Sequence, residues 1–166
     1  MYVRDFTPRD RDGCLAIFDG NTPPFFAPDV RAEFAAFLEE CNEPYFVVEH
    51  ADVIEGCGGF FVIPNTLVAV LSWGMVDRSR HCQGIGSLLL FARLQRLCQD
   101  PGVTVVKLQT SQYSRGFFER AGFEAEEVIM DGYAPGLDLV KMALALDSGR
   151  RAVIAQEAAA RNIVAV

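Results

Sequence analysis

Apolar and polar residues alternate in a way that divides the chain into short strand and helix candidates. Tyr2–Phe6 follows the two-residue period of a strand. Thr7 then offers an N-cap with Pro8 directly behind it, and Gly20 ends the predicted helix. A second helix is predicted beyond the proline-rich stretch Asn21–Pro28, because four apolar residues there share one face: Val30, Phe34, Phe37 and Leu38.

Three strand candidates follow in close succession, over Pro44–His50, Asp52–Ile63 and Thr66–Val76. Only the turn Pro64–Asn65 separates the last two, so we expect them to pair as an antiparallel hairpin. Thr66–Val76 is almost uninterrupted apolar sequence, which is typical of a strand buried on both faces. Gly74 near its end predicts a bulge or the close approach of a ligand.

The second half of the chain continues this alternation. A helix is predicted from Gly84 to about Gln99, and its two apolar stripes indicate packing between the sheet and other elements. A strand over Val103–Thr110, a short helix that stops at Gly122 and two closing strands complete the order. Strands joined both by hairpin turns and by helical crossovers indicate a mixed α/β sheet.

The length of 166 residues fits one domain, which we expect over residues 1–146. Residues 147–166 are Ala-rich and weakly amphipathic, so they could form a docked helix, a dimer contact or a frayed tail. The apolar residues of this tail slightly favour a homodimer.

Composition narrows the class of protein. The net charge of −7 argues against nucleic-acid binding, which needs a basic face, and fits a cationic small molecule or peptide. Five scattered cysteines without a CxxC pair, and only two histidines, indicate neither a disulfide framework nor a metal site. The polar N-terminus is unlike a signal peptide, and no run of eighteen apolar residues predicts a membrane span. We therefore expect a cytoplasmic protein.

The stretch VDRSRHCQGIGSLLL, residues 76–90, places two glycines one residue apart where a strand gives way to a helix. Gly84 and Gly86 let backbone N–H groups approach a ligand, and a helix N-terminus favours anions. Arg78 and Arg80 precede them, so the arrangement suits a pyrophosphate. It is neither a P-loop nor a dinucleotide fingerprint, because GxxxxGK[ST] is missing and Leu89 stands at the third small position.

Two motifs in this order resemble the GNAT N-acetyltransferases. His81–Gly86 matches the register of the cofactor-binding pattern of that family, and RGFFERAGF (Arg115–Phe123) is similar to its late helix with an aromatic pair. The order of strands and helices resembles the family to about Leu146. The resemblance implies a mixed, mostly antiparallel central sheet of about seven strands flanked by four helices.

The resemblance also implies acetyl-CoA as co-substrate, with no metal. A neutral primary amine of a small molecule or peptide would attack the thioester directly. Backbone groups before and inside the predicted helix would hold the pyrophosphate, and the end of the preceding strand would hold the pantetheine arm. The residues that the resemblance assigns to the cofactor are Met75, Val76, His81, Gln83, Gly84, Ile85, Gly86, Ser87, Ser111, Phe117 and Phe118.

The chain departs from the family at several positions. His81 replaces the usual Arg or Gln, and Cys82 an often-found Gly. Phe118 stands where the family often has a Tyr that protonates the thiolate, so we consider Ser114, Ser111 or a water held by them; alternatively, both serines only cap the helix.

The general base is also open, because Thr66–Val76 contains no Glu or Asp, which some members of the family carry there. Glu55 is the first candidate, since a hairpin partner can project toward the acceptor. The alternatives are an ordered water or one of three other side chains: Glu49, Asp131 and Tyr133.

The acceptor pocket is predicted from loop aromatics. Phe25 and Phe26, between prolines, could shape an apolar wall, or they could simply pack onto the core. Tyr133, in the loop between the closing strands, could close the other side. The predicted function is an N-acetyltransferase; the alternatives are a catalytically weak acyl-CoA-binding regulator with the same fold and an interaction domain that uses the tail.

Overall fold

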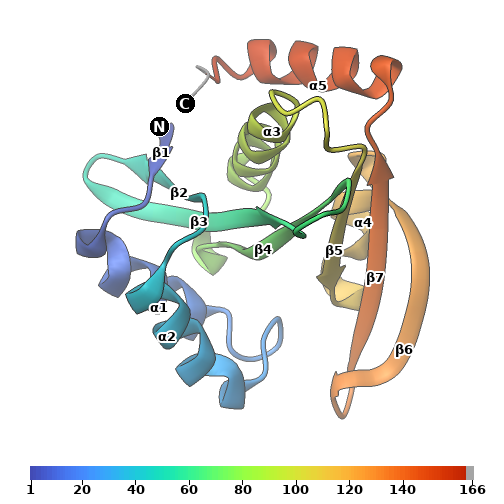
Figure 1. Ribbon diagram of the computed structural model, residues 1–166. Helices are drawn as coiled ribbons and strands as arrows, with labels where there is room; N and C mark the ends of the chain where they lie inside the picture. Colours follow the sequence, from blue (N-terminus) through green and yellow to red (C-terminus); the bar gives the residue numbers. More distant parts are fainter. Residues whose placement is uncertain (164–166) are drawn as a thin grey trace.

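The computed structural model describes residues 1–163 and contains one seven-stranded sheet, with strand order β1-β2-β3-β4-β5-β7-β6 (Figure 1). All neighbours are antiparallel except β4 and β5, which are parallel. The strands are β1 Tyr2–Asp5, β2 Tyr45–His50, β3 Val53–Val62, β4 Val68–Val76, β5 Val105–Thr110, β6 Glu124–Ala134 and β7 Leu137–Ala145. The predicted mixed, mostly antiparallel sheet of seven strands is confirmed.

The helices cover the sheet in layers. In Figure 1, α1 and α2 lie below β1–β4, α3 lies above them, and α5 lies over α3. The α-helices are α1 Arg11–Gly20, α2 Arg31–Glu40, α3 Ile85–Leu97, α4 Gln112–Arg120 and α5 Ser148–Ala160. Three short 3-10 helices precede α1, α2 and α3, namely η1 Pro8–Asp10, η2 Pro28–Val30 and η3 Arg78–Arg80.

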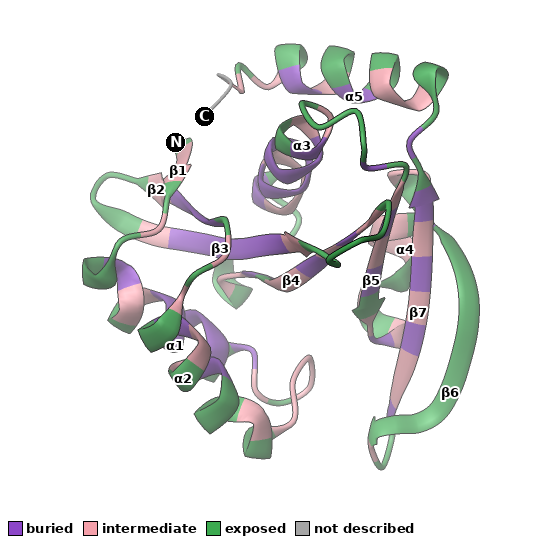
Figure 2. Cartoon of the chain, viewed as in Figure 1, coloured by how far each residue is buried: buried purple, intermediate pink, exposed green. Residues whose placement is uncertain are grey.

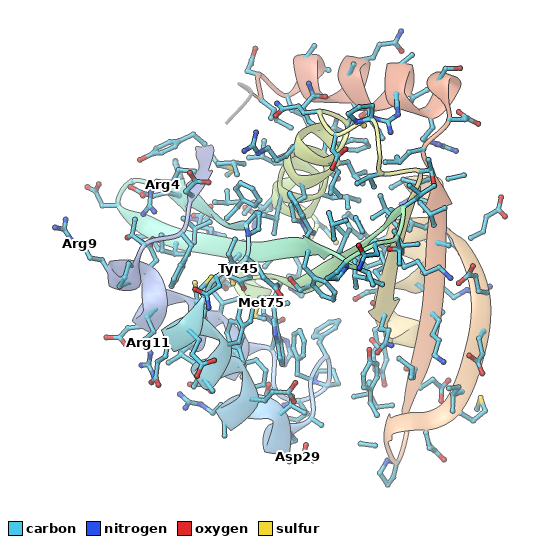
Figure 3. The ribbon with its side chains drawn as sticks, viewed as in Figure 1. Arg4, Arg9, Arg11, Asp29, Tyr45 and Met75 are labelled. Atoms are coloured by element: carbon cyan, nitrogen blue, oxygen red, sulfur yellow. The ribbon has the colours of Figure 1, made fainter. Side chains whose placement is uncertain are left out.

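Two apolar clusters hold these layers together. One lies on the side of α3, α4 and α5, and it buries most of α3, whose ribbon is largely purple in Figure 2. The other joins α1 and α2 to the opposite face of the sheet, and it includes Tyr45 and Met75, both labelled in Figure 3. Burial on two sides explains the two apolar stripes of the α3 sequence.

β4 and β5 stay paired only at their beginnings, where Val68–Val70 lies beside Val105–Lys107. Beyond this point the two strands diverge, and we call the region between residues 71–76 and 108–110 the fork. The β3–β4 register shifts between Cys57 and Gly59, and Trp73 has a φ of +44°, so the bulge predicted near Gly74 is confirmed. Gly74 is exposed as a result, although β4 is largely apolar.

The described residues contain five α-helices where four and a tail were predicted, because the tail forms α5, which is the docked-helix alternative. Asp147 caps this helix by accepting a hydrogen bond from the Arg150 N–H. Ile154 and Ala158 are buried in the face that packs toward α3. The Arg151 guanidinium ties the helix down by donating to the carbonyls of Leu146, Cys98 and Val103.

The sequence could not decide among the alternatives for the tail, because much of α5 is Ala and few large apolar residues mark its buried face. Residues 164–166 of the predicted tail lie outside the described residues. No helix within residues 1–163 is both long and apolar enough to cross a membrane.

Candidate functional site

The N-terminus of α3 opens beside the fork. Gly84 occupies the N-cap position with a φ of +86°, and Cys82 before it has a φ of +61°. No side chain caps the helix, so the first-turn N–H groups at Ile85, Gly86 and Ser87 face outward without a side-chain acceptor at the N-cap. The Ile85 side chain itself is buried against Gly56, so only its backbone is available to a ligand.

The loop between β4 and α3, residues 77–84, is held by local hydrogen bonds. The Asp77 carboxylate accepts from the Ser79 N–H at 2.8 Å, and the Asp77 carbonyl accepts from the Arg80 N–H at 2.8 Å. The Asp77 N–H donates to the carbonyl of Glu55 on β3 at 2.9 Å. The Gln83 side chain returns to the Ser79 carbonyl at 3.3 Å. The loop is therefore a compact turn.

The two arginines of this loop do not converge on the helix N-terminus as predicted. The Arg80 guanidinium turns toward β3, where Nη2 lies 2.7 Å from Oε1 of Glu55. The Arg78 guanidinium donates instead to the Pro23 carbonyl at 3.2 Å. Local sequence could not show this, because both acceptors lie far away along the chain.

His81 is not a free loop side chain. Its Nε2 lies 3.1 Å from the Val76 carbonyl, which also accepts from Asn21 Nδ2 at 2.8 Å. Asn21 is 2% exposed, and sequence reasoning did not single it out. Since the Val76 carbonyl already has two donors, the contact of Val76 with the pantetheine arm stays a prediction. Met75 is buried on the α1–α2 side, which leaves only its backbone for such a contact.

The aromatic pair of α4 lies against the start of α3. A Cβ atom built on Gly86 would lie 3.4 Å from Cζ of Phe117, so a larger residue there would press on that ring. The ring centroids of Phe117 and Phe118 are 4.9 Å apart, and those of Phe118 and Phe123 are 5.7 Å apart. Both members of the pair thus pack with apolar residues, and Phe118 offers no proton.

The two serines proposed as acids occupy different positions. Ser111 follows β5 at the N-cap of α4 and is 4% exposed, but its hydroxyl makes no capping hydrogen bond. Ser114 lies in the first turn of α4 and is half-buried. The geometry therefore does not show the purely capping role for Ser111, and the acid role of either serine stays a prediction.

Glu55, the predicted base, is 3% exposed on β3. Its Oε1 contacts both Arg80 and, at 3.4 Å, Nδ1 of His50. Its Oε2 is buried without a hydrogen-bond partner. The carboxylate is thus joined to the loop before α3, and its role as base stays a prediction.

The two predicted acceptor phenylalanines separate. Phe26 packs onto Phe18 of the core, with ring centroids 5.1 Å apart. The ring centroid of Phe25 instead lies 5.2 Å from that of His81 and 5.9 Å from that of Tyr113 on α4. Phe25 therefore connects the loop before α3 with α4. Tyr133 is 41% exposed on the edge strand β6 and has no aromatic contact within residues 1–163.

Arg93 on α3 is a charged residue that sequence reasoning missed. It is 3% exposed, no carboxylate pairs with it in the described part of the chain, and burial lowers its pKa to about 10. Its guanidinium fits only because Gly58 and Gly74 lack side chains: Cβ atoms there would lie 3.0 and 2.9 Å from Nη1. A cation within the apolar helix, together with the glycines of β3 and β4, was the available signal.

The Arg93 hydrogen bonds are weak for a buried charge. Nε lies 3.3 Å from the Leu89 carbonyl, and Nη1 lies 3.4 Å from the Gly59 carbonyl. The charge therefore lies directly behind the exposed backbone of Gly74 in the fork.

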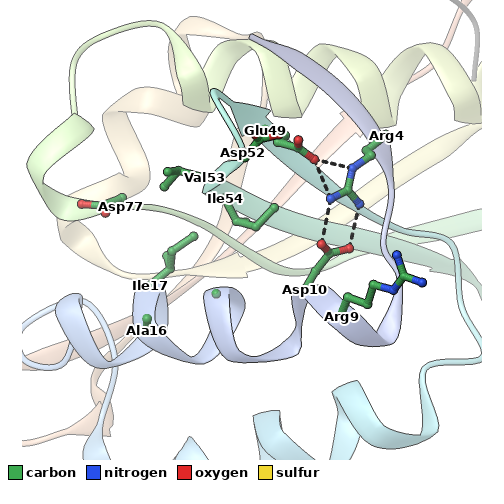
Figure 4. Close-up of a pocket in the computed structure, with 11 residues that line it drawn as sticks. Arg4, Arg9, Asp10, Ala16, Ile17, Glu49, Asp52, Val53, Ile54 and Asp77 are labelled. Carbon is green, nitrogen blue, oxygen red and sulfur yellow. Dashed lines mark hydrogen bonds and ion pairs between the residues drawn. The ribbon is translucent and has the colours of Figure 1, made fainter.

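A separate pocket of about 500 Å³ lies between α1 and the β2–β3 turn (Figure 4). Arg4 crosses it and donates to Asp10 at 2.7 Å and to Glu49 at 2.6 Å. None of the residues predicted to hold the cofactor lines this pocket. Within residues 1–163, no group of three His, Cys, Asp or Glu residues could hold a metal ion.

Comparison with known structures shows the same fold in acetyltransferases. A protein of the GNAT family from Desulfovibrio desulfuricans superposes with a TM-score of 0.74 and 24% identity over 86% of this chain and 97% of its own. A ribosomal-protein-alanine N-acetyltransferase from Brucella melitensis gives 0.68 and 20%, over 88% and 100%. An aminoglycoside 6′-N-acetyltransferase complexed with coenzyme A gives 0.70 and 16%, over 87% and 97%.

A comparison with curated proteins finds no significant match. The sequence model of the acetyltransferase (GNAT) family, however, matches residues 14–123, which include most of α1, the fork, α3 and α4. The chain belongs to the acetyltransferase (GNAT) family.

Proposed function

We propose that this protein transfers the acetyl group of acetyl-CoA to a primary amine of a small molecule or peptide by direct attack. The observation that carries the proposal is the uncapped N-terminus of α3, which opens beside the fork of β4 and β5. Family membership supports acetyl-CoA as the acetyl donor, because the segment that matches the family contains both the N-terminus of α3 and the fork.

The residues present fit a pyrophosphate. Gly84, with its positive φ, turns the chain so that the N–H groups of the first turn point outward, and these groups together with the helix dipole attract an anion. The contacts come from the backbone of Gln83, Gly84, Gly86 and Ser87. The presence of His81 and Cys82 in place of the family residues is therefore compatible with binding.

The fork supplies the place for the transfer. The amine lone pair attacks the thioester carbon, the C–S bond breaks, and the electron pair leaves with the sulfur, which then takes up a proton. The exposed backbone at Gly74 and the Arg93 guanidinium behind it favour the negative charge that develops on the thioester oxygen and the sulfur.

Proton transfer needs a donor other than Phe118. We assign it to Ser111, Ser114 or a water that they hold, since Ser111 lies at the end of β5 and has no capping bond. Because Oε1 of Glu55 is already bound to Arg80, ordered water is the simpler base for the incoming ammonium.

A second candidate function keeps the fold and the ligand without the reaction. The specific observation in its favour is Phe118, whose ring packs against Phe117 and Phe123 at the position of the missing Tyr. In that case the protein binds acyl-CoA as a regulator.

The homodimer prediction loses its support from the tail, because Ile154 and Ala158 of α5 pack within the chain itself.

The first experiment measures the melting temperature with and without acetyl-CoA. Ligand at about 100 times its Kd should stabilise the fold by about 2.7 kcal/mol, which raises the melting temperature by several degrees. No rise would contradict the proposed ligand and both candidate functions.

Release of free thiol then separates the enzyme from the regulator. The panel of amines should include an aminoglycoside and a peptide with N-terminal alanine, since structural neighbours are described as acting on these groups. Binding without amine-dependent thiol release across the panel would favour the regulator.

A further inference from the structure

Glu55 is an unusual residue for its place in the sheet. It lies on β3 and is 3% exposed, and Gly56 and Cys57 after it are buried as well. A carboxylate is expensive to remove from water unless a cation and hydrogen bonds compensate it. The compensating cation is Arg80, whose side chain is 44% exposed and comes from the loop before α3.

Glu55 holds this loop at two points. Its backbone carbonyl accepts from the Asp77 N–H at 2.9 Å, at the start of η3. Its side-chain Oε1 binds Arg80 Nη2 at 2.7 Å, at the end of η3. The Arg80 N–H closes the arrangement by donating to the Asp77 carbonyl at 2.8 Å. The short helix η3 is thereby fastened to β3 at both ends.

The fastened segment leads directly to the ligand-binding turn. Only residues 81–83 separate Arg80 from Gly84. Two of the turn residues, Cys82 and Gly84, have positive φ values of +61° and +86°. A positive φ is energetically unfavourable for Cys82, whereas glycine adopts it freely. The turn therefore needs support from its surroundings to keep this shape.

We propose that Glu55 and Arg80 are positioning residues for coenzyme A, because their ion pair holds the loop 77–84 in the shape that presents the α3 N–H groups to the pyrophosphate. This inference rests on the proposed function. It gives Glu55 a role other than general base, and it gives Arg80 a role other than direct contact with a phosphate.

Three variants test the contact: Glu55→Gln, Arg80→Gln and the double variant. We measure the Kd of coenzyme A by calorimetry, together with kcat and the KM for acetyl-CoA. Each single change should raise the Kd about tenfold, the usual loss for one charged hydrogen bond. The Kd of the double variant should not exceed the higher of the two single-variant Kd values, because both changes remove the same contact.

The split between binding and turnover separates positioning from catalysis. At saturating acetyl-CoA, kcat should stay within about threefold of wild type, since only the ground-state fit of the loop is affected. Arg80→Lys keeps the charge and should restore part of the affinity. Glu39→Gln is the matched control, because Glu39 forms an exposed ion pair with Arg11 between α1 and α2 and should leave the Kd unchanged.

Each competing role predicts a different outcome. If Arg80→Gln weakens binding and Glu55→Gln does not, Arg80 contacts the ligand directly and the inference is wrong. If Glu55→Gln lowers kcat with an unchanged Kd, Glu55 is the base and the inference is also wrong. If Glu55→Gln does not fold, wild-type affinity in Arg80→Gln still excludes the positioning role.

The proposed function fails in a different way. Wild-type protein that does not bind coenzyme A contradicts the proposed function before any variant is compared. Wild-type binding with unchanged Kd values in both single variants contradicts only the positioning role.

Discussion

The sides of the site proposed for the cofactor and for the acceptor present different chemical groups: backbone N–H groups on one and side chains on the other. On the side proposed for the cofactor, the loop 77–84 and α3 present backbone N–H groups, and the buried residues Asn21 and Glu55 bond the backbone of Val76 and Asp77 just before and at the start of this loop. On the side proposed for the acceptor, Phe25 and Tyr113 present partly or largely exposed side chains from a loop and a helix, and the exposed Tyr133 lies on the edge strand β6. Figure 2 shows β6 exposed along almost its whole length.

This difference predicts that side-chain substitutions affect binding of the acceptor more than binding of the cofactor. Backbone donors remain when side chains change, so we expect the proposed cofactor side to tolerate His81 and Cys82 provided that the shape of the loop is kept. An acceptor wall of side chains changes with each substitution. The variants below should therefore separate the two sides, since each is expected to affect one of them.

The largest effect should follow from Gly84→Val on the cofactor side. A β-branched residue at a φ of +86° is strained by about 1–3 kcal/mol, and the turn would rearrange to relieve that strain. We expect the Kd of coenzyme A to rise about 100-fold, because the N–H groups of the turn would no longer converge.

Gly20→Ala is the matched control for a glycine. Gly20 ends α1 without a positive φ, and a Cβ there would meet no atom within 4 Å. Unchanged coenzyme A binding in Gly84→Val would show that the backbone of this turn is not the ligand site.

The next effect concerns the charge behind the bulge. Arg93→Met should lower kcat about tenfold, because it removes a buried cation close to Gly74. The free energy of unfolding should change little, because an unpaired charge no longer has to be buried. Chemical denaturation and steady-state kinetics measure the two quantities.

Arg96→Met serves as the control on the same helix, since Arg96 is exposed. A kcat equal to that of wild type in Arg93→Met would restrict Arg93 to a packing role.

A smaller effect is expected on the acceptor side. Phe25→Ala removes the ring that bridges His81 and Tyr113, so the KM for the amine should rise about fivefold, with a smaller change in the KM for acetyl-CoA. Phe26→Ala should act mainly on stability, lowering the free energy of unfolding by about 2 kcal/mol, because Phe26 packs onto Phe18. Equal effects of both changes on the amine KM would contradict the separation of the two rings.

The smallest effect on coenzyme A binding should come from Asp10→Asn, in the pocket of Figure 4, which none of the residues predicted to hold the cofactor lines. The Arg4 guanidinium lowers the pKa of Asp10. Because the folded pKa lies below the unfolded value of about 3.9, the ion pair stabilises the fold fully above that value, and this contribution is lost as the pH falls through the folded pKa.

Denaturation curves between pH 7 and pH 2 check this prediction. Wild type should lose more stability than Asp10→Asn below about pH 4, with no difference in coenzyme A binding at pH 7. Parallel acid profiles would show that Asp10 contributes nothing to the pH dependence.

The local pattern of residues was enough to predict the elements and the turn before α3. Apolar periods placed the seven strands and the first four helices, and Gly84 with Gly86 marked the start of α3, because these signals are local along the chain. Residue types also indicated the family, since its motifs lie within short segments.

Which side chains meet could be seen only in the folded chain. The contact of Glu55 with Arg80, the position of Arg93 behind Gly74 and the separation of Phe25 from Phe26 join residues from different elements or turn neighbours in different directions. The docking of α5 depends on Arg151 reaching two carbonyls that are distant along the chain, those of Cys98 and Val103. Such contacts depend on rotamers and on strand divergence, which a one-dimensional pattern of polarity does not encode.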